Sequence, residues 1–157
     1  MRLTTVALSG FFISCGCQTV WDTQFIDAPL DLKFHTMRFL DNCDKYNKRC
    51  KLHNLKLMWV DELSDNRVGE CRISWEGFLY SQEIRISRKT NPATVDMVIM
   101  HELTHCVRFV DHHPGDIPHI MRSYDFTEYE LTQKPRQEWI KEVFDWNKKS
   151  EGFKHHE

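Results

Sequence analysis

The amino-acid sequence predicts an α+β fold on a small mixed sheet, and two observations carry this prediction. Segments with the hydrophobic period of an α-helix lie near both ends and in the middle of the chain, and segments with the alternation of β-strands lie between the first helix and the central one. At 157 residues, of which 41% are hydrophobic, the chain is long enough to bury one core and is typical of a globular protein.

Charged side chains are nearly balanced, with 21 Lys and Arg against 23 Asp and Glu. They are mixed along the chain and form no basic stripe of the kind that binds nucleic acid. They also form no basic face for a membrane surface. The composition therefore argues against a nucleic-acid partner and against electrostatic binding to lipid headgroups.

The first segment, MRLTTVALSGFFISCGCQTV, differs from everything after it. Arg2 precedes an apolar run over residues 3–13, and small residues and cysteine follow. The run is too short to span a bilayer as a permanent helix. This order predicts a secretory signal over residues 1–16 and a linker over residues 17–29, with a short hydrophobic strand or helix as the alternative.

The same segment resembles bacterial lipoprotein leaders, in which a cysteine that follows small residues is lipidated and becomes the mature N-terminus. Cys15, preceded by Ser14, and Cys17, preceded by Gly16, are the two candidates. The resemblance implies an exported protein that is either periplasmic or tethered to a membrane by an acyl chain that does not span it.

Four cysteines lie beyond this segment: Cys43, Cys50, Cys71 and Cys106. An exported protein can oxidise such cysteines, and Cys43 and Cys50 lie close enough in sequence to pair across a helix end. Buried free thiols explain each of the four equally well. Because no CxxC pair exists, a cysteine-based zinc knuckle is not expected.

Residues 30–46 predict an N-terminal helix, since hydrophobic side chains recur there at helical spacing. Residues 54–63, 70–75 and 78–87 alternate as strands do, and Gly77 predicts a hairpin between the last two. Near the end of the third strand, isoleucines face one way and Glu83, Arg85 and Ser87 face the other. This alternation predicts a half-exposed edge strand over residues 82–87.

The central helix is predicted to begin with Asn91 as its N-cap and Pro92 at its first helical position. An apolar stripe anchors its back and consists of Ile99, Leu103, Val107 and Val110. His101 and His105 project together from the opposite side, one turn apart, with Glu102 between the two faces. A final helix is predicted after Pro135, with one apolar side formed by Trp139, Ile140, Val143 and Phe144.

The stretch HELTH at residues 101–105 has the spacing of a zinc peptidase motif. Two histidines at positions i and i+4 point their rings at one place, as two Zn–N bonds of about 2.0–2.1 Å require. Glu102 cannot share that direction, but it can take a proton from a water on the metal, whose pKa zinc lowers toward about 7. A surface helix that carries these residues by chance is the alternative interpretation.

A catalytic zinc ion needs a third protein ligand. If the helix continued unbroken, His112 would lie about 10 Å along the axis from His105, at 1.5 Å per residue. His113 precedes Pro114, which disfavours helical dihedral angles there. The helix must therefore end before His112, and the chain must fold back. Four candidates for the third ligand follow the helix: Asp111, His112, His113 and His119.

The run HELTHCVRFVDHH, followed by PHIM, resembles the metzincin clan of zinc peptidases, in particular its small matrixin-like bacterial members. The resemblance covers residues 98–124. In that clan, the active helix is followed by a turn that delivers the third ligand and then by a methionine turn beneath the metal. Met121 matches that methionine.

The spacing of the clan leaves the third ligand open. The usual count gives Asp111, and a glycine usually stands where this chain has Arg108. Some bacterial relatives carry one extra residue and read DH, which gives His112, whereas counting back from the methionine gives His113. We favour His112, because imidazole is a common zinc ligand and the extra residue replaces the freedom of the missing glycine. Asp111 is then expected to orient an imidazole.

The resemblance implies a zinc-dependent endopeptidase, a hydrolase of peptide or protein substrates, with zinc as its cofactor. The expected zinc ligands are His101, His105 and His112. Glu102 would be the general base toward a metal-activated water and would pass the proton to the leaving amine. The peptidase domain would span residues 30–150 and leave a tail at 151–157.

Three further residues or segments are interpreted in the light of this clan. Its extended substrates pair with an exposed strand, for which residues 82–87 are the candidate, although an ordinary solvated edge explains them equally well. Tyr124 stands one position later than a tyrosine that assists at the metal in some metzincins, so a core or rim position is expected. Cys106 is expected to pack at the back of the central helix.

Two alternatives to this function stay open. In a thermolysin-like peptidase, a distant carboxylate would be the third ligand, and the candidates are Glu128, Glu130 and Glu138. In a non-catalytic lipoprotein, the helix would be a zinc-binding module for a partner. Glu102 argues against the latter, since a structural zinc site closes its fourth position and needs no general base.

Overall fold

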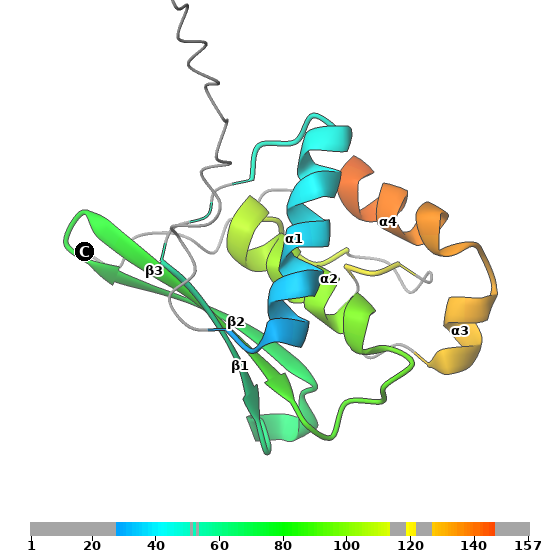
Figure 1. The fold of residues 1–157 in the computed structure, drawn as a ribbon, viewed down its shortest axis with the longest axis horizontal. Helices are drawn as coiled ribbons and strands as arrows, with labels where there is room; N and C mark the ends of the chain where they lie inside the picture. Colours follow the sequence, from blue (N-terminus) through cyan, green and yellow to red (C-terminus); the bar gives the residue numbers. More distant parts are fainter. Residues whose placement is uncertain (1–27, 51, 53, 114–118, 122–126, 147–157) are drawn as a thin grey trace, which may run out of the picture.

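The computed structural model describes residues 28–50, 52, 54–113, 119–121 and 127–146. The predicted leader, most of the linker, Tyr124 and the tail lie outside these residues. The elements are α1 (Leu30–Lys45), β1 (Leu55–Val60), the 3-10 helix η2 (Ser64–Asn66), β2 (Gly69–Glu76), β3 (Leu79–Ser87), α2 (Val95–Arg108), α3 (Glu128–Thr132) and α4 (Arg136–Asp145). The α+β class is confirmed, and Figure 1 shows the arrangement.

The three strands form one mixed sheet in the order β1-β3-β2. β1 runs parallel to β3, and β2 runs antiparallel to it through a hairpin in which Gly77 has a φ of 63°. The prediction that residues 82–87 form an edge strand is therefore wrong, because β3 is the central strand. The charged side chains of β3 face the uncovered side of the sheet, and exposure of one face gives the same sequence alternation as a free edge.

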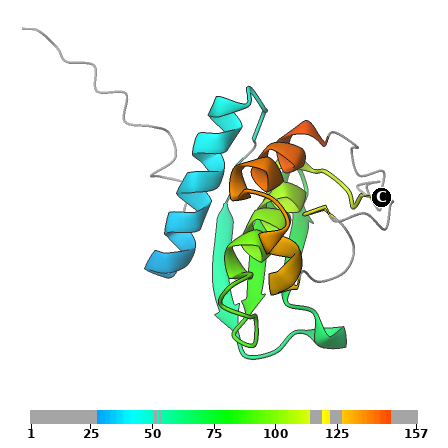
Figure 2. The same ribbon diagram turned by 90° about the vertical axis from the view of Figure 1, so that its right-hand side faces the viewer.

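Helices cover the other face of the sheet. α2 contacts β2 and β3, and α1 contacts β1 and α2, as Figure 2 shows from the side. The largest side chains between the layers are fully buried: Phe39, Leu55, Leu57, Ile84, Ile86, Ile99, Leu103, Trp139 and Phe144. Three residues of the predicted apolar back of α2 lie in this core, namely Ile99, Leu103 and Val107, as does the predicted apolar side of α4. The fourth, Val110, is buried but lies beyond the end of the helix. The core fixes α2 against the sheet.

The terminal helices pack through aromatic rings. The ring of Phe144 on α4 lies 5.4 Å from that of Phe39 on α1 and 5.1 Å from that of Tyr46, measured between centroids. The short helix α3 was not predicted. Its signal is present in the sequence, because Thr127 and Glu130 form a capping box in which each side chain bonds the backbone N–H of the other.

The central helix α2 begins later than predicted. Its first residue is Val95 and its N-cap is Thr94, so the expected start at Asn91 and Pro92 is wrong. Asn91 caps the turn before the helix, since its Oδ1 accepts a hydrogen bond of 2.9 Å from the backbone N–H of Ala93. The capping chemistry is the one expected, but it serves an Asx turn that leads into the helix.

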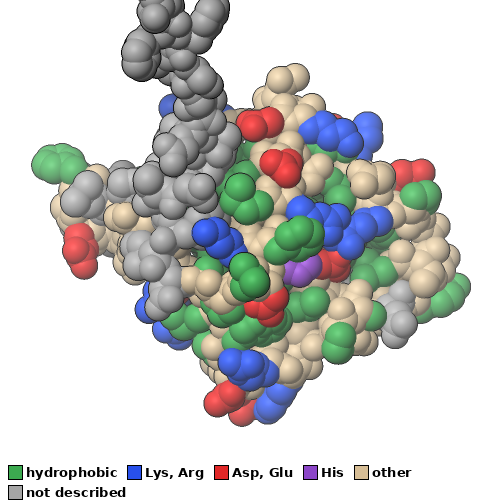
Figure 3. Space-filling view, in the orientation of Figure 1, with side chains coloured by type: hydrophobic (Ala, Val, Ile, Leu, Met, Phe, Trp, Pro, Cys, Tyr) green, Lys and Arg blue, Asp and Glu red, His purple; other side chains and the backbone are tan. Residues whose placement is uncertain are grey.

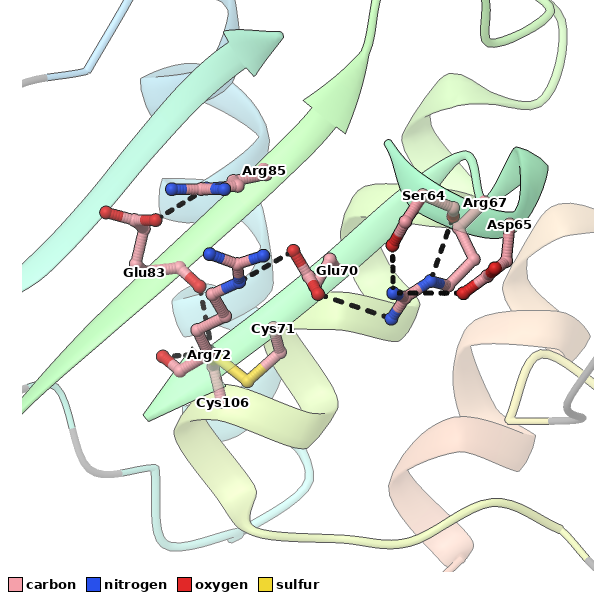
Figure 4. Close-up of polar contacts among 9 residues, drawn as sticks. All are labelled: Ser64, Asp65, Arg67, Glu70, Cys71, Arg72, Glu83, Arg85 and Cys106. Atoms are coloured by element: carbon pink, nitrogen blue, oxygen red, sulfur yellow. Dashed lines mark hydrogen bonds and ion pairs between the residues drawn. A yellow bond between two sulfur atoms is a disulfide. The ribbon is translucent and has the colours of Figure 1, made fainter. Parts of the chain in front are cut away.

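The uncovered face of the sheet carries charges in alternation. Glu70 on β2 pairs with Arg67 at 3.2 Å and with Arg72 at 2.8 Å. On β3, Glu83 pairs with Arg85 at 2.6 Å. The strand register sets Glu70 opposite Arg85 and Arg72 opposite Glu83, so the charges also complement each other across the hairpin (Figure 4).

All four cysteines of the described residues are paired. Cys43, in the last turn of α1, bonds Cys50 beyond its end, which decides between the two alternatives that the sequence left open, a disulfide and free thiols. Cys106 bonds Cys71, so Cys106 is more than the packing residue that the sequence suggested. This second disulfide ties the last turn of α2 to the edge strand β2 (Figure 4).

Charged side chains of both signs lie on the outer surface. Figure 3 shows acidic and basic side chains interspersed over one face of the molecule. Among the described residues, no helix is both long enough and apolar enough to cross a bilayer.

Removing the two disulfides separately should have unequal effects. Cys71–Cys106 spans 35 residues and Cys43–Cys50 spans 7. Loops of these lengths correspond to about 3.8 and about 2.4 kcal/mol of entropic stabilisation. Urea denaturation of the Cys71→Ala/Cys106→Ala variant should therefore give the larger loss in free energy of unfolding than that of Cys43→Ala/Cys50→Ala. Equal losses, or a larger loss for the shorter loop, would contradict the tethering role.

Candidate metal centre

Two imidazoles project from the front of α2 and converge. His101 and His105 are half-buried, and their Nε2 atoms lie 2.9 Å apart. Each ring uses its other nitrogen for a backbone carbonyl: Nδ1 of His101 lies 2.5 Å from O of Ile120, and Nδ1 of His105 lies 2.6 Å from O of Val110. A carbonyl only accepts, so each Nδ1 carries the proton and donates it. Both Nε2 atoms are therefore left with a free lone pair.

The chain leaves α2 in the way that a third ligand requires. The helix ends at Arg108, and Phe109 takes the left-handed conformation with φ 57° and ψ 45°. Arg108 stays helical and donates to the carbonyls of Val143 and Trp146 at 2.7 and 2.9 Å. The sharp exit thus occurs at Phe109, and the predicted end of the helix before His112 is confirmed.

Of the four candidates for the third ligand, His112 reaches the pair. Its Nε2 lies 3.2 Å from Nε2 of both His101 and His105. The three ligand atoms lie within 4.8 Å of one another, and these residues could hold a metal ion. Figure 1 shows the chain returning beside the end of α2.

The other histidines serve a different cluster. The ring of His113 stacks against those of His119 and Trp146, at centroid distances of 4.6 and 4.5 Å. His119 is buried, and its Nδ1 accepts a 3.0 Å hydrogen bond from the backbone N–H of Met121. Both rings therefore support the returning chain, and Met121 lies fully buried in the turn that follows His119.

Asp111 lies next to the cluster without entering it. Its Oδ1 accepts a 2.8 Å hydrogen bond from the backbone N–H of His112, whereas Nδ1 of the His112 ring lies 4.0 Å away. That separation is too long for a hydrogen bond. The expectation that Asp111 orients an imidazole is therefore corrected: it holds the backbone of His112, and carbonyls orient the other two rings.

The separations suit a tetrahedral zinc ion. With Zn–N bonds of about 2.0–2.1 Å, tetrahedral ligands stand about 3.3 Å apart, close to the distances among the three Nε2 atoms. Burial, followed by the neighbouring imidazoles, lowers the pKa of His101 to about 3 and that of His105 to about 4. Burial also lowers the pKa of His112. The rings are thus neutral at pH 7, and neutral imidazole is the form that binds a metal.

Glu102 points from the same helix toward the start of β2. Its side chain is 7% exposed and accepts a hydrogen bond from the backbone of Cys71. Burial and the Glu70 carboxylate raise the pKa of Glu102 to about 8, against the opposing effects of that hydrogen bond and of Arg67. The carboxyl group of Glu102 is therefore enclosed between α2 and the edge strand.

Gly69 makes room for this carboxyl group. A Cβ on Gly69 would lie 2.7 Å from Oε1 of Glu102 and 2.7 Å from Cγ1 of Val98. Because the φ of Gly69 is not positive, the position needs glycine for space and not for its backbone conformation. A close backbone approach of this kind often marks a glycine within a strand.

Of the distant carboxylates of the alternative site, Glu130 is engaged elsewhere. Glu130 accepts hydrogen bonds from the N–H and Oγ1 of Thr127, at 2.8 and 2.9 Å. Glu138 is exposed on α4, and Glu128 belongs to α3. Within the described residues, the group that gathers around His101 and His105 contains His112 and no glutamate.

Sequence reasoning missed the groups that orient the ligands. The carbonyls of Val110 and Ile120 carry no sequence signal, because every residue has a carbonyl. Gly69 had a signal, as a glycine that opens a strand, but nothing in the sequence set it beside Glu102. Trp146 donates from Nε1 to O of Asp111 at 2.9 Å, a contact between residues 35 positions apart.

Substituting Gly69 by alanine should displace Glu102. The added methyl group overlaps the carboxylate and Val98, so we expect a loss of about 1–3 kcal/mol in free energy of unfolding, measured by chemical denaturation. Ser74→Ala, on the exposed side of the same strand, is the matched control and should be near neutral. In a Glu102→Ala background the cost of Gly69→Ala should shrink. A Gly69→Ala variant as stable as the control would refute the close approach.

Comparisons of the chain with models of known protein families, with curated proteins and with solved structures gave no match. The function of the centre is therefore inferred from the geometry and chemistry of its own residues.

Proposed function

We propose that the protein is a zinc-dependent endopeptidase with a metzincin-like arrangement of its site. The observation that carries this proposal is the convergence of three imidazole Nε2 atoms, of which those of His101 and His105 have bare lone pairs, on a helix that also carries the buried Glu102. Two bare lone pairs 2.9 Å apart repel each other unless a cation lies between them. A pair of histidines with the intervening glutamate is the arrangement that metal-assisted peptide hydrolysis uses.

The chain's own residues would divide the work. His101, His105 and His112 would hold the ion. When bound, zinc supplies Lewis-acid chemistry that polarises a water molecule and the peptide carbonyl. Glu102 would act in its deprotonated form, which a bound cation would favour over the protonated form that a pKa of about 8 gives in the metal-free protein. It would accept a proton from the attacking water and donate it to the leaving amide nitrogen, so its carboxyl group would end in the state in which it began.

A catalytic site is favoured over a structural one by the number of protein ligands. A structural zinc ion takes four protein ligands, whereas a catalytic one takes three and keeps one position open. Only three ligand residues gather in the described part of the chain, and the His112 side chain is 44% exposed. The centre therefore has a solvent side from which a substrate can approach.

Two features support the metzincin-like assignment in particular. The ring of His101 is held by Ile120, the residue before Met121, so the turn that contains the methionine is tied to the first ligand. The extra residue between His105 and His112 is accommodated by Phe109 in the left-handed conformation. We infer that Met121 plays the part of the clan's methionine turn.

The substrate would bind along β2. β2 lies at the edge of the sheet, and Gly69 and Cys71 near its start contact Glu102. An extended peptide can pair with such a strand through main-chain hydrogen bonds. The scissile bond would then pass close to the carboxylate. This assignment replaces β3, which the sequence analysis named as a candidate.

We further propose an oxidising, extracytoplasmic location. The two disulfides Cys43–Cys50 and Cys71–Cys106 are rare chemistry in a reducing cytosol. They agree with the secretory signal expected over residues 1–16, and lipidation of Cys15 or Cys17 would tether the enzyme to a membrane.

Replacing Glu102 by Gln should abolish peptide hydrolysis and leave zinc bound. The amide has nearly the same shape but cannot take up a proton. Cleavage of a diverse peptide library, together with metal analysis of the same samples, tests this, and cleavage by the variant at the wild-type rate would overturn the proposal. A zinc-loaded wild type that cleaves no peptide would support the non-catalytic alternative.

Replacing His112 by Ala should weaken zinc binding, because two ligands remain of three. Competition with a chromophoric chelator measures the affinity, and His113→Ala is the matched control from the neighbouring residue. Because the His113 ring stacks on His119 and Trp146, the His113→Ala variant should bind zinc more tightly than the His112→Ala variant. If the His112→Ala variant bound zinc more tightly than the His113→Ala variant, the assignment of His112 as the third ligand would be wrong.

A further inference from the structure

The third ligand is held differently from the other two. His101 and His105 lie on a packed helix, and each donates from Nδ1 to a carbonyl. His112 lies on a segment without regular secondary structure, and its ring is more exposed. Its position therefore depends on whatever fixes the backbone of residues 109–113.

One side chain from the last helix contacts that backbone. Nε1 of Trp146 donates a 2.9 Å hydrogen bond to O of Asp111, the residue before His112. The Trp146 ring also lies 4.5 Å from the ring of His113, the residue after it. The indole thus contacts the residues on both sides of His112.

Trp146 is itself fixed against the end of α2. It is the C-cap of α4, with its N–H bonded to O of Glu142 at 3.0 Å. Arg108 donates to O of Trp146 at 2.9 Å and to O of Val143 at 2.7 Å, and its guanidinium lies 5.0 Å from the centre of the Phe144 ring. The last residue of α2 therefore holds α4, and the C-cap of α4 holds the loop that returns to α2.

We propose that Trp146 is the positioning residue for the third zinc ligand. It acts through the backbone of Asp111 and the ring of His113, touches neither the ion nor the substrate, and sets where the His112 imidazole can stand. The arrangement also explains Arg108: where the clan uses glycine to turn, this chain keeps a helical arginine that anchors α4 against the site. This inference rests on the proposed zinc site.

The test compares zinc affinities by competition with a chromophoric chelator in the full-length chain. Trp146→Phe keeps an aromatic ring beside His113 and removes the N–H, and we expect a loss of about 10-fold to 100-fold in affinity, as for other partners that orient metal ligands. The matched control is Trp59→Phe, which removes an indole N–H bonded to Asp31 at 3.0 Å on an exposed part of the fold. The control should bind zinc as the wild type does.

A double-mutant cycle separates positioning from general loosening of the fold. If Trp146 acts through the third ligand, Trp146→Phe should cause no further loss of affinity in a His112→Ala background. A loss of the same size in that background, or a Trp146→Phe variant that binds as tightly as the control, overturns the inference. If the wild type binds no zinc at all, it is the proposed function that fails.

A second variant guards against misfolding. Circular dichroism of the metal-free proteins shows whether Trp146→Phe keeps its helices. If it does not, Arg108→Lys keeps the charge and loses the fork that holds the carbonyls of Val143 and Trp146. Arg108→Lys should weaken zinc binding in the protein that keeps His112 and leave it unchanged in the His112→Ala variant. Any other result contradicts the chain of contacts.

Discussion

Two backbone carbonyls fix the imidazole tautomers on which the proposed metal centre depends. By accepting the Nδ1 protons of His101 and His105, the carbonyls of Ile120 and Val110 force both rings into the tautomer that leaves Nε2 bare. Burial then keeps the rings uncharged. The result is two bare lone pairs whose nitrogens lie 2.9 Å apart, a repulsion that the proposed divalent cation would relieve.

The rest of the fold positions the groups around those two bonds. The core fixes the back of α2, so that its histidines stay in front. The Cys71–Cys106 disulfide joins α2 to the edge strand, and the same strand supplies Gly69 and the backbone of Cys71 to Glu102. At the C-terminal end of α2, Trp146 contacts the returning chain at Asp111 and His113. The proposed general base and the proposed third ligand are thus held by separate elements, each tied to the helix that carries the motif.

Much of the site could be predicted from the sequence, because its signals are local. The spacing of His101 and His105 is a helical period, with Glu102 between them. Pro114 disfavours helical dihedral angles at His113, which indicated that the helix ends nearby and that His112 can fold back toward the two histidines. The central position of β3 could not be predicted, since a strand with one uncovered face has the same alternation as an edge strand. The contacts of Gly69 and Trp146 could not be predicted either. They join residues that are distant in the sequence, and they involve backbone atoms, which carry no sequence signal.

The most direct test of the central claim is X-ray absorption spectroscopy of the wild-type protein loaded with one equivalent of zinc. Three imidazole nitrogens at about 2.0–2.1 Å, with one further light atom in the fourth position, are the coordination that the structure leads us to expect. A shell with sulfur, with fewer than three imidazoles, or closed by four protein ligands would contradict it.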